Sequence, residues 1–579
     1  MVLGRCLSKF ILHLLLFFVL NHLCTSAVLS PRRKEAEDKE DISPAFWERL
    51  ARERLKRSNK IFSSPHTPAK NVILFLGDGM GMPTISAGRF FKVEVEDRWD
   101  EANPILAFEN WPFHTMCRTY DLRTTVTDSA SSATAYLGGT KTNTGVIGLT
   151  GAVSPKSCRK HKVGERVESV LEAAVEAGMA TGIVTTSRVT HASPAGAFAH
   201  TASRHWESDR QLMKDCPGVP ELPMDIAQQL VEGNPSINVV LGGGSRAFFP
   251  SGSRGDRLDG RNLANEWLAS QTSRGRRAKL ITDASQFLLT DFSEVDYLLG
   301  ELRIFEVCWR MVAVMECYEP PQGCLRTLNQ YSQTVLGLLN SSHLPYDSER
   351  RKNEPSLANL TTTAISILSR QPKGFFLFVE GARIDHAHHS NFGKKALLDL
   401  LAFENAIQTA IQMVNLEETL VIVTADHSHS FMLVGGRPDR RRSLLTENIE
   451  LAKYILDGKG MLPLMYSSGP AGAVNTTRLN LTSLSNTTLH DIRFQQPAFI
   501  PLPWATHGGE DVGIYATGTF SFLFHSTVDN TFVGQAMKYA LCLRPFEMEP
   551  HCLACWLAPS LFTLTVALLL SQAVSFQGC

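Results

Sequence analysis

The stretch NVILFLGDGMG, residues 71–81, indicates the class of fold. Its first part, Val72–Leu76, is a short, continuous apolar run, and Asp78 follows within a glycine-rich segment. A continuous run of this length is typical of a strand buried on both faces, as in a parallel sheet. The stretch therefore predicts a buried strand that ends at a polar residue.

Three further apolar runs repeat this pattern along the chain. Phe375–Val379 leads into Glu380, Leu420–Val423 leads towards Asp426, and Ile183–Val184 leads into TTSRVTHAS. Helical patterns, such as those over residues 166–177 and 394–414, lie between the runs. Strands that alternate with helices in this way predict an α/β fold.

Asp78, Glu380 and Asp426 each follow closely on a predicted strand. Ligands bind at the carboxyl ends of the strands in open α/β sheets, so these three carboxylates are expected to converge. A single aspartate after a strand is usually a turn or helix-cap residue. Three of them beside histidines favour a ligand site instead.

Histidines and carboxylates gather in three segments that predict a metal centre. The segments are EGARIDHAHH with Glu380, Asp385, His386, His388 and His389, then TADHSHS with Asp426, His427 and His429, then WATHGGED with His507, Glu510 and Asp511. Asp385 and His389 are four residues apart and would share one face of a helix. Zinc takes imidazole and carboxylate ligands, whereas magnesium prefers oxygen, so the set suits two or three divalent ions. Any one histidine could instead be a solvated surface residue.

The segment TTVTDSASSATAYLGG, residues 124–139, reads as a loop that runs into a helix. Thr127 or Asp128 is the expected N-cap, which places Ser129 at the helix N-terminus, where backbone N–H groups and the helix dipole favour anions. A serine at this position is usually only a cap. A zinc ion that binds its alkoxide would make Ser129 a nucleophile.

The two ends of the chain resemble targeting segments. Arg5 and Lys9 precede the apolar run Phe10–Leu20, which predicts a signal peptide over residues 1–26. Residues 552–579 carry no charge and contain a hydrophobic tail, which favours replacement by a GPI anchor, with a simple transmembrane tail as the alternative. Between them lie an N-terminal arm, residues 27–70, and a catalytic region, residues 71–551. In the arm, Phe46, Trp47, Leu50 and Leu55 have helical spacing and would pack on the core or on a partner subunit.

The composition is balanced in charge, and the predicted secretion changes how the cysteines and sequons are interpreted. The 579 residues include 57 Lys+Arg and 57 Asp+Glu, and this balance gives no indication of a nucleic-acid partner. After secretion the cysteines can form disulfides. Five Asn-x-Ser/Thr sequons predict glycosylated loops at Asn340, Asn359, Asn475, Asn480 and Asn486.

Taken together, these motifs resemble the animal alkaline phosphatases from about residue 44 to residue 543. The resemblance is carried by NVILFLGDGMG at 71–81, VTDSA at 126–130, THASPAG at 190–196, LGGG at 241–244, FFLFVEGARIDHAHH at 375–389, VTADHSH at 423–429 and THGGED at 506–511. It implies a three-layer sandwich whose large, mostly parallel central sheet is flanked by helices. It also implies a homodimeric phosphomonoesterase on the extracellular face of the cell membrane.

The resemblance also implies a role for each matched residue. Ser129 resembles the phosphorylated nucleophile, and Arg204, in ASRHW, resembles the arginine that holds the substrate phosphate. The implied ligands are Asp385, His389 and His507 for a first Zn²⁺, Asp78, Asp426 and His427 for a second Zn²⁺, and Asp78, Ser193 and Glu380 for one Mg²⁺. His191 and His386 match positions near the magnesium and the phosphate. A disulfide between Cys158 and Cys216 is implied in the same way, and one from Cys542 to Cys552 or Cys555.

The chain departs from the family pattern in two places. Residues 301–337 separate two segments that are almost contiguous in the family. This insertion is either a loop with its own disulfide or a gene-model error, and we favour the second. The acidic loop of the family's calcium site, expected after Pro250, is shortened here to SGSRGDRLDG, and neighbouring acidic positions appear as Asn340 and Glu354. No Ca²⁺ is therefore expected. An inactive surface protein, or a related sulfatase or phosphodiesterase, remains the alternative to a phosphomonoesterase.

Overall fold

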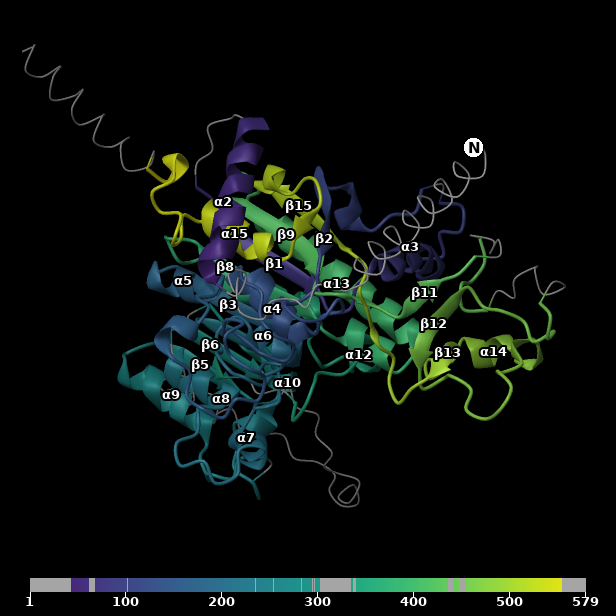
Figure 1. Ribbon diagram of the computed structural model, residues 1–579, viewed down its shortest axis with the longest axis horizontal. Helices are drawn as coiled ribbons and strands as arrows, with labels where there is room; N and C mark the ends of the chain where they lie inside the picture. The colour runs from purple at the N-terminus through teal and green to yellow at the C-terminus, as the bar shows by residue number, and fades with distance from the viewer. Residues whose placement is uncertain are drawn as a thin grey trace, which may run out of the picture. The chain divides into compact units, whose positions relative to one another are not determined.

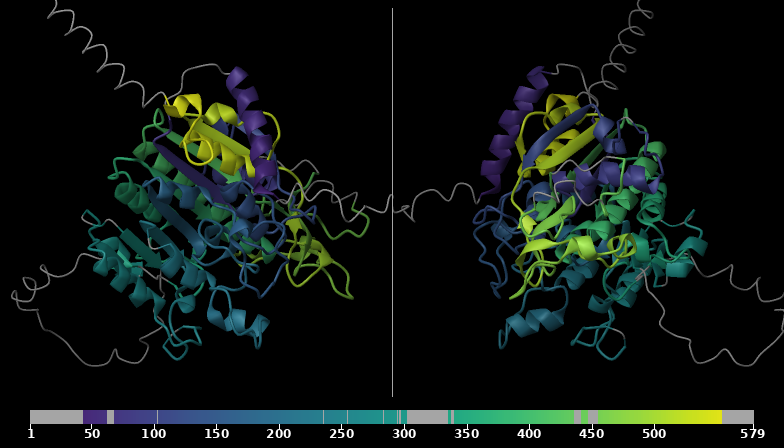
Figure 2. Two further views of the ribbon diagram at one scale, coloured as in Figure 1. Left: turned by 60° about the vertical axis from the view of Figure 1, so that its left-hand side comes forward. Right: turned by 90° about the vertical axis from the view of Figure 1, so that its right-hand side faces the viewer.

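A sheet of 11 strands forms the centre of the protein (Figures 1 and 2). The computed structural model describes residues 43–61, 68–301, 335–336, 340–435, 441–446 and 455–553, except residues 102, 235, 254, 283, 294 and 296. The described residues lie in one unit, Ile42–Cys579. The predicted signal peptide, most of the 301–337 segment and residues 554–579 of the predicted C-terminal tail lie outside them.

The sheet is mostly parallel. Its strands, in spatial order, are β16 (Val528–Asp529), β2 (Phe113–Arg118), β15 (Val512–Gly518), β9 (Thr419–Ala425), β1 (Asn71–Gly77), β8 (Phe375–Gly381), β3 (Ala180–Arg188), β4 (Val239–Gly243), β6 (Tyr297–Glu301), β5 (Ala278–Ile281) and β7 (Val335–Leu336). Among these strands, only β15 runs antiparallel to its neighbours. The predicted α/β fold with a mostly parallel sheet is confirmed.

The four apolar runs of the sequence form the middle of this sheet, in the order β9, β1, β8, β3. Every residue of β8 and β9 is buried, as expected for strands covered on both faces. Leu76 lies opposite Glu380 on one side and Thr424 on the other, so the carboxyl ends of three strands are level. This register brings Asp78, Glu380 and Asp426 to one edge of the sheet.

Two layers of helices pack against the sheet (Figures 1 and 2). One layer consists of α4 (Ser129–Gly138), α5 (Val170–Glu176), α6 (Ala192–Ala195) and α15 (Thr531–Ala540). The other consists of α3 (Met82–Val95), α11 (Leu357–Leu368) and α13 (Gly393–Met413), joined by the short α12 (Arg383–His389). With the sheet between them, these layers form the expected three-layer sandwich.

The predicted N-terminal helix is α2, Pro44–Ile61, and it packs on α15 of the same chain. Trp47, Ala51 and Leu55 are buried, whereas Leu50 is 42% exposed. The core packing predicted for this helix is therefore present, and the exposed Leu50 lies on its outer side.

The helix predicted over residues 166–177 begins later, at Val170. Ser169 caps it by accepting a hydrogen bond from the backbone N–H of Glu172, whose carboxylate accepts one from the backbone N–H of Ser169. This capping box fixes the first turn, so the apolar periodicity before Ser169 does not extend the helix.

Two smaller sheets lie beside the main one. β11 (Phe431–Leu433), β12 (Leu464–Gly469) and β13 (Ala498–Pro501) form a three-stranded sheet. β10 (Ser428–His429) pairs with β14 (His507–Gly508), which sets His429 directly opposite His507. The other α-helices of the described residues are α7 (Asp209–Asp215), α8 (Ile226–Gln228), α9 (Leu263–Ser273), α10 (Ala284–Leu289) and α14 (Asn486–Leu489).

Candidate active site

A first group of possible metal ligands surrounds Asp385 on α12. The Nε2 atoms of His389, His429 and His507 lie 3.3, 3.5 and 3.7 Å from its carboxylate oxygens. One ligand atom from each of these four residues lies within 4.8 Å of the others. Carboxylate and imidazole donors at this spacing are the ligands that zinc takes in proteins.

Backbone carbonyl groups orient two of these imidazoles. His389 Nδ1 lies 2.6 Å from the carbonyl oxygen of Ala505, and His507 Nδ1 lies 3.0 Å from that of Thr127. An N–H that donates to a carbonyl fixes the tautomer and turns the other nitrogen towards the metal position. Both rings therefore present Nε2 to Asp385.

A second group consists of Asp78, Asp385 and His427, whose ligand atoms again lie within 4.8 Å of one another. His427 Nε2 is 3.6 Å from Asp78 and 3.2 Å from Asp426. The His427 ring stacks on His507, with a centroid distance of 3.6 Å. Asp385 belongs to both groups, so the two candidate sites are adjacent.

Five carboxylate oxygens of this site lack a hydrogen-bond donor. Both oxygens of Asp78, together with Oδ1 of Asp385, Oδ2 of Asp426 and Oε1 of Glu380, are buried without a hydrogen-bond partner. Burial, followed by the charge of Asp426, raises the pKa of Asp78 well above its usual range. Burial raises the pKa of Glu380 to about 7. Buried anions require a paired charge or a metal, so these residues fit divalent cations.

Glu380 and Ser193 lie on the adjoining elements β8 and α6, and both are buried. One oxygen of Glu380 accepts hydrogen bonds from the hydroxyl groups of Thr185 and Ser187, the latter at 3.1 Å. Its other oxygen has no such partner, which leaves it available to an ion.

Ser129 is the first residue of α4, and Asp128 is its N-cap. The Asp128 carboxylate accepts hydrogen bonds from the backbone N–H groups of Ser131 and Gly145, at 3.1 and 3.0 Å. Its other oxygen lies 3.0 Å from Nη1 of Arg204. Although burial acts to raise it, the pKa of Asp128 is lowered to about 2, chiefly by Arg204. The cap thus remains ionised and holds the arginine beside the helix start.

The Ser129 hydroxyl faces the second ligand group, with Oγ 3.4 Å from His427 Nε2. Arg204 is held by the N-cap Asp128, and its Nη2 is 3.3 Å from His191 Nε2. His191 is in turn close to His386, with ring centroids 5.4 Å apart. The structure therefore brings Ser129, Arg204, His191 and His386 beside the ligand groups. Of the other candidates, His388 bonds the hydroxyl groups of Thr84 and Tyr466, and Glu510 accepts from Ser428, so neither joins these groups; Asp511 is not among them either.

Two histidines in this region had no assigned ligand role, although the sequence analysis named His429 among the candidate ligands of the TADHSHS segment. His429 joins the first ligand group only because β10 pairs with β14, and its sole signal was its place in the TADHSHS segment. His343 lies on a loop beside His386, with ring centroids 4.1 Å apart, and no sequence pattern indicates it.

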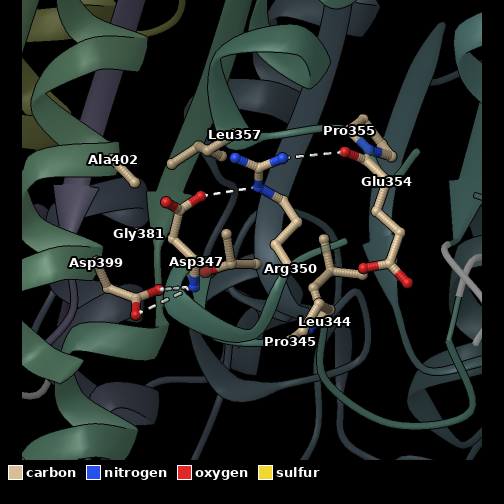
Figure 3. Close-up of a pocket in the computed structure, with 11 residues that line it drawn as sticks. Leu344, Pro345, Asp347, Arg350, Glu354, Pro355, Leu357, Gly381, Asp399 and Ala402 are labelled. Carbon is tan, nitrogen blue, oxygen red and sulfur yellow. Dashed lines mark hydrogen bonds and ion pairs between the residues drawn. The ribbon is translucent and has the colours of Figure 1, made fainter. Parts of the chain in front are cut away.

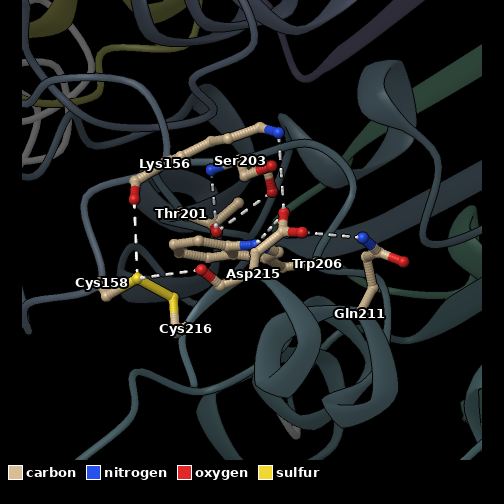
Figure 4. The surroundings of a disulfide bond; sticks show 8 residues. All are labelled: Lys156, Cys158, Thr201, Ser203, Trp206, Gln211, Asp215 and Cys216. Atoms are coloured by element: carbon tan, nitrogen blue, oxygen red, sulfur yellow. Dashed lines mark hydrogen bonds and ion pairs between the residues drawn. A yellow bond between two sulfur atoms is a disulfide. The ribbon is translucent and has the colours of Figure 1, made fainter. Parts of the chain in front are cut away.

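Cys158 and Cys216 form a disulfide, with Trp206 packed in the same apolar cluster (Figure 4). Trp206 Nε1 donates to Asp215 at 3.1 Å, and Gln211 donates to the same carboxylate at 3.0 Å. Because Trp206 lies two residues after Arg204, this cluster supports the segment that carries the arginine. Of the two alternatives for Cys542, the structure contains the disulfide to Cys552.

Four of the five sequon asparagines, Asn359, Asn475, Asn480 and Asn486, are exposed. Asn340 is half-buried, and its side-chain amide donates to the carbonyl oxygen of His343 at 2.5 Å. A membrane-spanning helix, long and apolar enough to cross a bilayer, is absent from the part of the chain that the structure describes.

A mostly parallel α/β sheet whose carboxyl edge gathers carboxylates, imidazoles, a serine and an arginine is typical of hydrolases that use metal ions. The sequence model of the alkaline phosphatase family matches residues 69–307 and 324–543. The chain belongs to the alkaline phosphatase family and is a phosphoric monoester hydrolase. The interruption of the match, residues 308–323, falls inside the 301–337 segment.

Relatives agree with this assignment. The chain is 33% identical to the tissue-nonspecific alkaline phosphatase of Gallus gallus, over 96% of this chain and 98% of that protein. It is 35% identical to an alkaline phosphatase of Gadus morhua, over 87% and 98%, and to a membrane-bound alkaline phosphatase of Bombyx mori, over 86% of each.

Solved structures share the fold. The alkaline phosphatase of the Antarctic bacterium TAB5 superposes with a TM-score of 0.52 at 20% identity, covering 83% of this chain and 99% of that one. That of Thermus thermophilus gives a TM-score of 0.54 at 21% identity, covering 89% and 96%.

Proposed function

We propose that the chain hydrolyses phosphate monoesters at alkaline pH through a phosphoserine intermediate on Ser129, with two Zn²⁺ and one Mg²⁺. The observation that carries this proposal is the position of Ser129. Its Oγ lies 3.4 Å from His427 Nε2, at a helix N-terminus whose cap, Asp128, also pairs with Arg204.

The residues would divide between three ions. Asp385, His389 and His507 would hold the first zinc, with His429 beside them, and Asp78, Asp426, His427 and Ser129 would hold the second. Asp78, Ser193 and Glu380 would hold magnesium, which accepts oxygen ligands alone. The bound ions would supply charge stabilisation of the attacking and leaving oxygens.

The chain's own residues would position the phosphoryl group. Arg204 presents a planar guanidinium that can hold two phosphate oxygens, and Asp128 keeps it beside Ser129. His191, within 3.3 Å of Arg204, and His386 would contact the phosphate from the same side. A bond forms between Ser129 Oγ and phosphorus as the ester P–O bond breaks and the alcohol leaves. Water then cleaves the phosphoserine, which restores Ser129 and releases inorganic phosphate.

The nucleophile can be tested by trapping. Wild-type protein incubated with labelled phosphate and quenched in acid should retain the label, whereas Ser129→Ala should retain none and lose turnover of p-nitrophenyl phosphate. Ser132→Ala is the matched control, since this serine lies in the same helix and its hydroxyl bonds only a backbone carbonyl. Label on Ser129→Ala would place the nucleophile elsewhere. Wild-type protein without chelator-sensitive activity would favour the inactive surface protein.

We also propose that the protein is a homodimer on the extracellular face of the cell membrane, held by a GPI anchor that replaces the C-terminal tail. Because Cys552 is disulfide-bonded to Cys542, the replaced part begins after Cys552 rather than at residue 552. The membrane-bound relative from Bombyx mori supports a membrane location. Exposed Leu50 on α2 supports an interface between subunits. The exposed Asn359, Asn475, Asn480 and Asn486 could carry glycans, and Asn340 would have to give up its bond to the backbone to do so.

A further inference from the structure

A buried tyrosine of α4 lies beside the residues assigned to magnesium. Tyr136 is 1% exposed and comes about two helical turns after Ser129. Its ring stacks on that of Phe378 in β8, with centroids 6.3 Å apart and an angle of 23° between the planes. Phe378 precedes Glu380 by two residues, and side chains at this spacing in a strand point to the same face. The Tyr136 ring therefore lies on the face of the sheet from which Glu380 extends.

Three polar atoms in this region lack hydrogen-bond partners among the described residues. They are the hydroxyl oxygens of Tyr136 and Ser193 and Oε1 of Glu380, and all three side chains are buried. Gly196 lets α6, which carries Ser193, approach α4, because a β-carbon at this position would lie 2.6 Å from Cβ of Ala133. Buried polar atoms without partners cost free energy, so their gathering indicates a partner that arrives with a ligand.

Electrostatic effects connect the three groups. Burial, followed by the charges of Asp426 and Glu380, raises the pKa of Tyr136 well above its usual range. Against burial, the Ser193 hydroxyl acts to lower the pKa of Tyr136 and that of Glu380. Ser193 is therefore a neighbour of both residues, and Tyr136 is a neutral phenol with a proton to donate.

We propose that Tyr136 is a positioning residue for the magnesium ion and acts through Ser193. The inference rests on the proposed function, in which Ser193 and Glu380 hold this ion. A serine hydroxyl has one proton and two lone pairs. Tyr136 would donate to one lone pair, the Ser193 proton would go to Glu380, and the second lone pair would face the ion.

Magnesium makes the orientation of this hydroxyl important. The ion demands near-octahedral coordination by oxygen, so a ligand hydroxyl that rotates freely binds it poorly. A hydrogen bond from Tyr136 would remove that freedom from Ser193. Partners that orient a metal ligand in this way are worth about 10–100-fold in metal affinity.

Magnesium binding to variants tests this role. Wild-type protein and Tyr136→Phe are loaded with zinc and equilibrated with a series of free Mg²⁺ concentrations, and both metals are counted per chain by mass spectrometry. Tyr136→Phe should need about 10-fold more free Mg²⁺ for half-saturation, with unchanged zinc content. Tyr515→Phe is the matched control, because the buried hydroxyl of Tyr515 lies 4.0 Å from Sδ of Met82, and this variant should bind magnesium as the wild type does.

Thermal unfolding separates positioning from a general structural role. Tyr136→Phe keeps the ring on Phe378 and removes a buried hydroxyl that lacks a partner without the ion. The metal-free variant should therefore melt no lower than the metal-free wild type. At a fixed Mg²⁺ concentration, the rise in melting temperature should be smaller in the variant, because it binds the ion more weakly.

Ser193→Ala removes the proposed intermediary. If Tyr136 acts through Ser193, adding Tyr136→Phe to Ser193→Ala should weaken magnesium binding no further. An additive loss in the double variant would overturn the proposal, and so would equal magnesium affinity in Tyr136→Phe and the wild type. A wild type that takes up no magnesium would instead overturn the magnesium assignment of the proposed function, and this inference with it.

Discussion

At the residue scale, Asp399 on α13 is a buried carboxyl group outside the metal centre (Figure 3). It lines a pocket with Asp347 and Arg350, and its two oxygens face the backbone N–H of Asp347 at 3.4 Å. Burial raises the pKa of Asp399 to about 8, against the lowering effect of Arg383. The group is therefore protonated in the folded protein at neutral pH.

This pKa predicts a dependence of stability on pH. The unfolded chain releases the Asp399 proton near pH 4, whereas the folded protein keeps it until about pH 8, so stability falls as pH rises between these values. Asp399→Asn cannot ionise. It should gain stability over the wild type by on the order of a few kcal/mol at pH 9, and little at pH 4.

Thermal unfolding at pH 4, 7 and 9 would measure the effect of Asp399→Asn. The control is Asp100→Asn, at an exposed position, which should follow the wild type at every pH. A melting temperature of Asp399→Asn that differs from the wild type by the same amount at all three values would contradict the prediction.

Residues at strand ends were predictable, and residues placed by long-range pairing were not. Asp78, Glu380 and Asp426 could be expected to converge because parallel strands end at the same edge of a sheet. His429 enters the site through the β10–β14 pairing, and His343 through a loop without a periodic pattern. The TADHSHS segment named His429 as a candidate but could not show which ion group it joins, and no local pattern signals His343.

At the scale of elements, one disulfide closes a segment that carries several parts of the site. The segment between Cys158 and Cys216 contains β3, α6 and Arg204, and its cysteines are 58 residues apart. A second disulfide, between Cys542 and Cys552, spans 10 residues. The entropy of loop closure makes the longer cross-link the more stabilising of the two.

Replacing Cys158 and Cys216 by alanine should lower the free energy of unfolding by about 4 kcal/mol, on the loop-entropy estimate. The matched variant without Cys542 and Cys552 should lose about 3 kcal/mol. The first variant should also bind inorganic phosphate more weakly, because Trp206 packs with that disulfide and stands two residues from Arg204. Denaturant titrations measure the loss of unfolding free energy, and inhibition by inorganic phosphate measures phosphate binding. Equal phosphate affinity in the two variants would contradict the predicted effect of the Cys158–Cys216 disulfide on Arg204.

The boundaries of elements followed local chemistry. Asp128, one of the two expected caps, begins α4 because its carboxylate accepts from the backbone N–H of Ser131. The helix predicted over residues 166–177 starts too early, because the apolar periodicity extends to residues before Ser169, which caps the helix. Periodicity shows which face is buried, whereas a cap decides where the helix starts.

At the scale of the whole molecule, the class of fold was predictable and the order of strands was not. Apolar runs between helices predict a parallel sheet, but β1 (from Asn71) lies between β8 (from Phe375) and β9 (from Thr419), which are far along the chain from it. That arrangement depends on contacts which no short window of sequence contains.

The proposed membrane anchor predicts how the protein leaves a cell. Phospholipase C specific for phosphatidylinositol should release most of the phosphatase activity from intact expressing cells into the medium. The phospholipase cleaves a lipid anchor but not a transmembrane segment of polypeptide. Phosphatase activity that stays on the treated cells would therefore support the transmembrane tail. A form that ends at Leu553, which keeps the disulfide between Cys542 and Cys552, should appear in the medium without treatment.

The pairing of β10 with β14 fixes the number of residues just before His507, whereas an exposed stretch earlier in the chain has no such constraint. Successive residues of a strand point to opposite sides, so one residue added between Ala505 and His507 would turn the imidazole away from Asp385. The stretch from Val474 to Asn480 is exposed and carries no such register. An inserted tag or loop belongs in the second stretch. Over evolutionary time, the segment before His507 should tolerate amino-acid substitutions more readily than insertions or deletions.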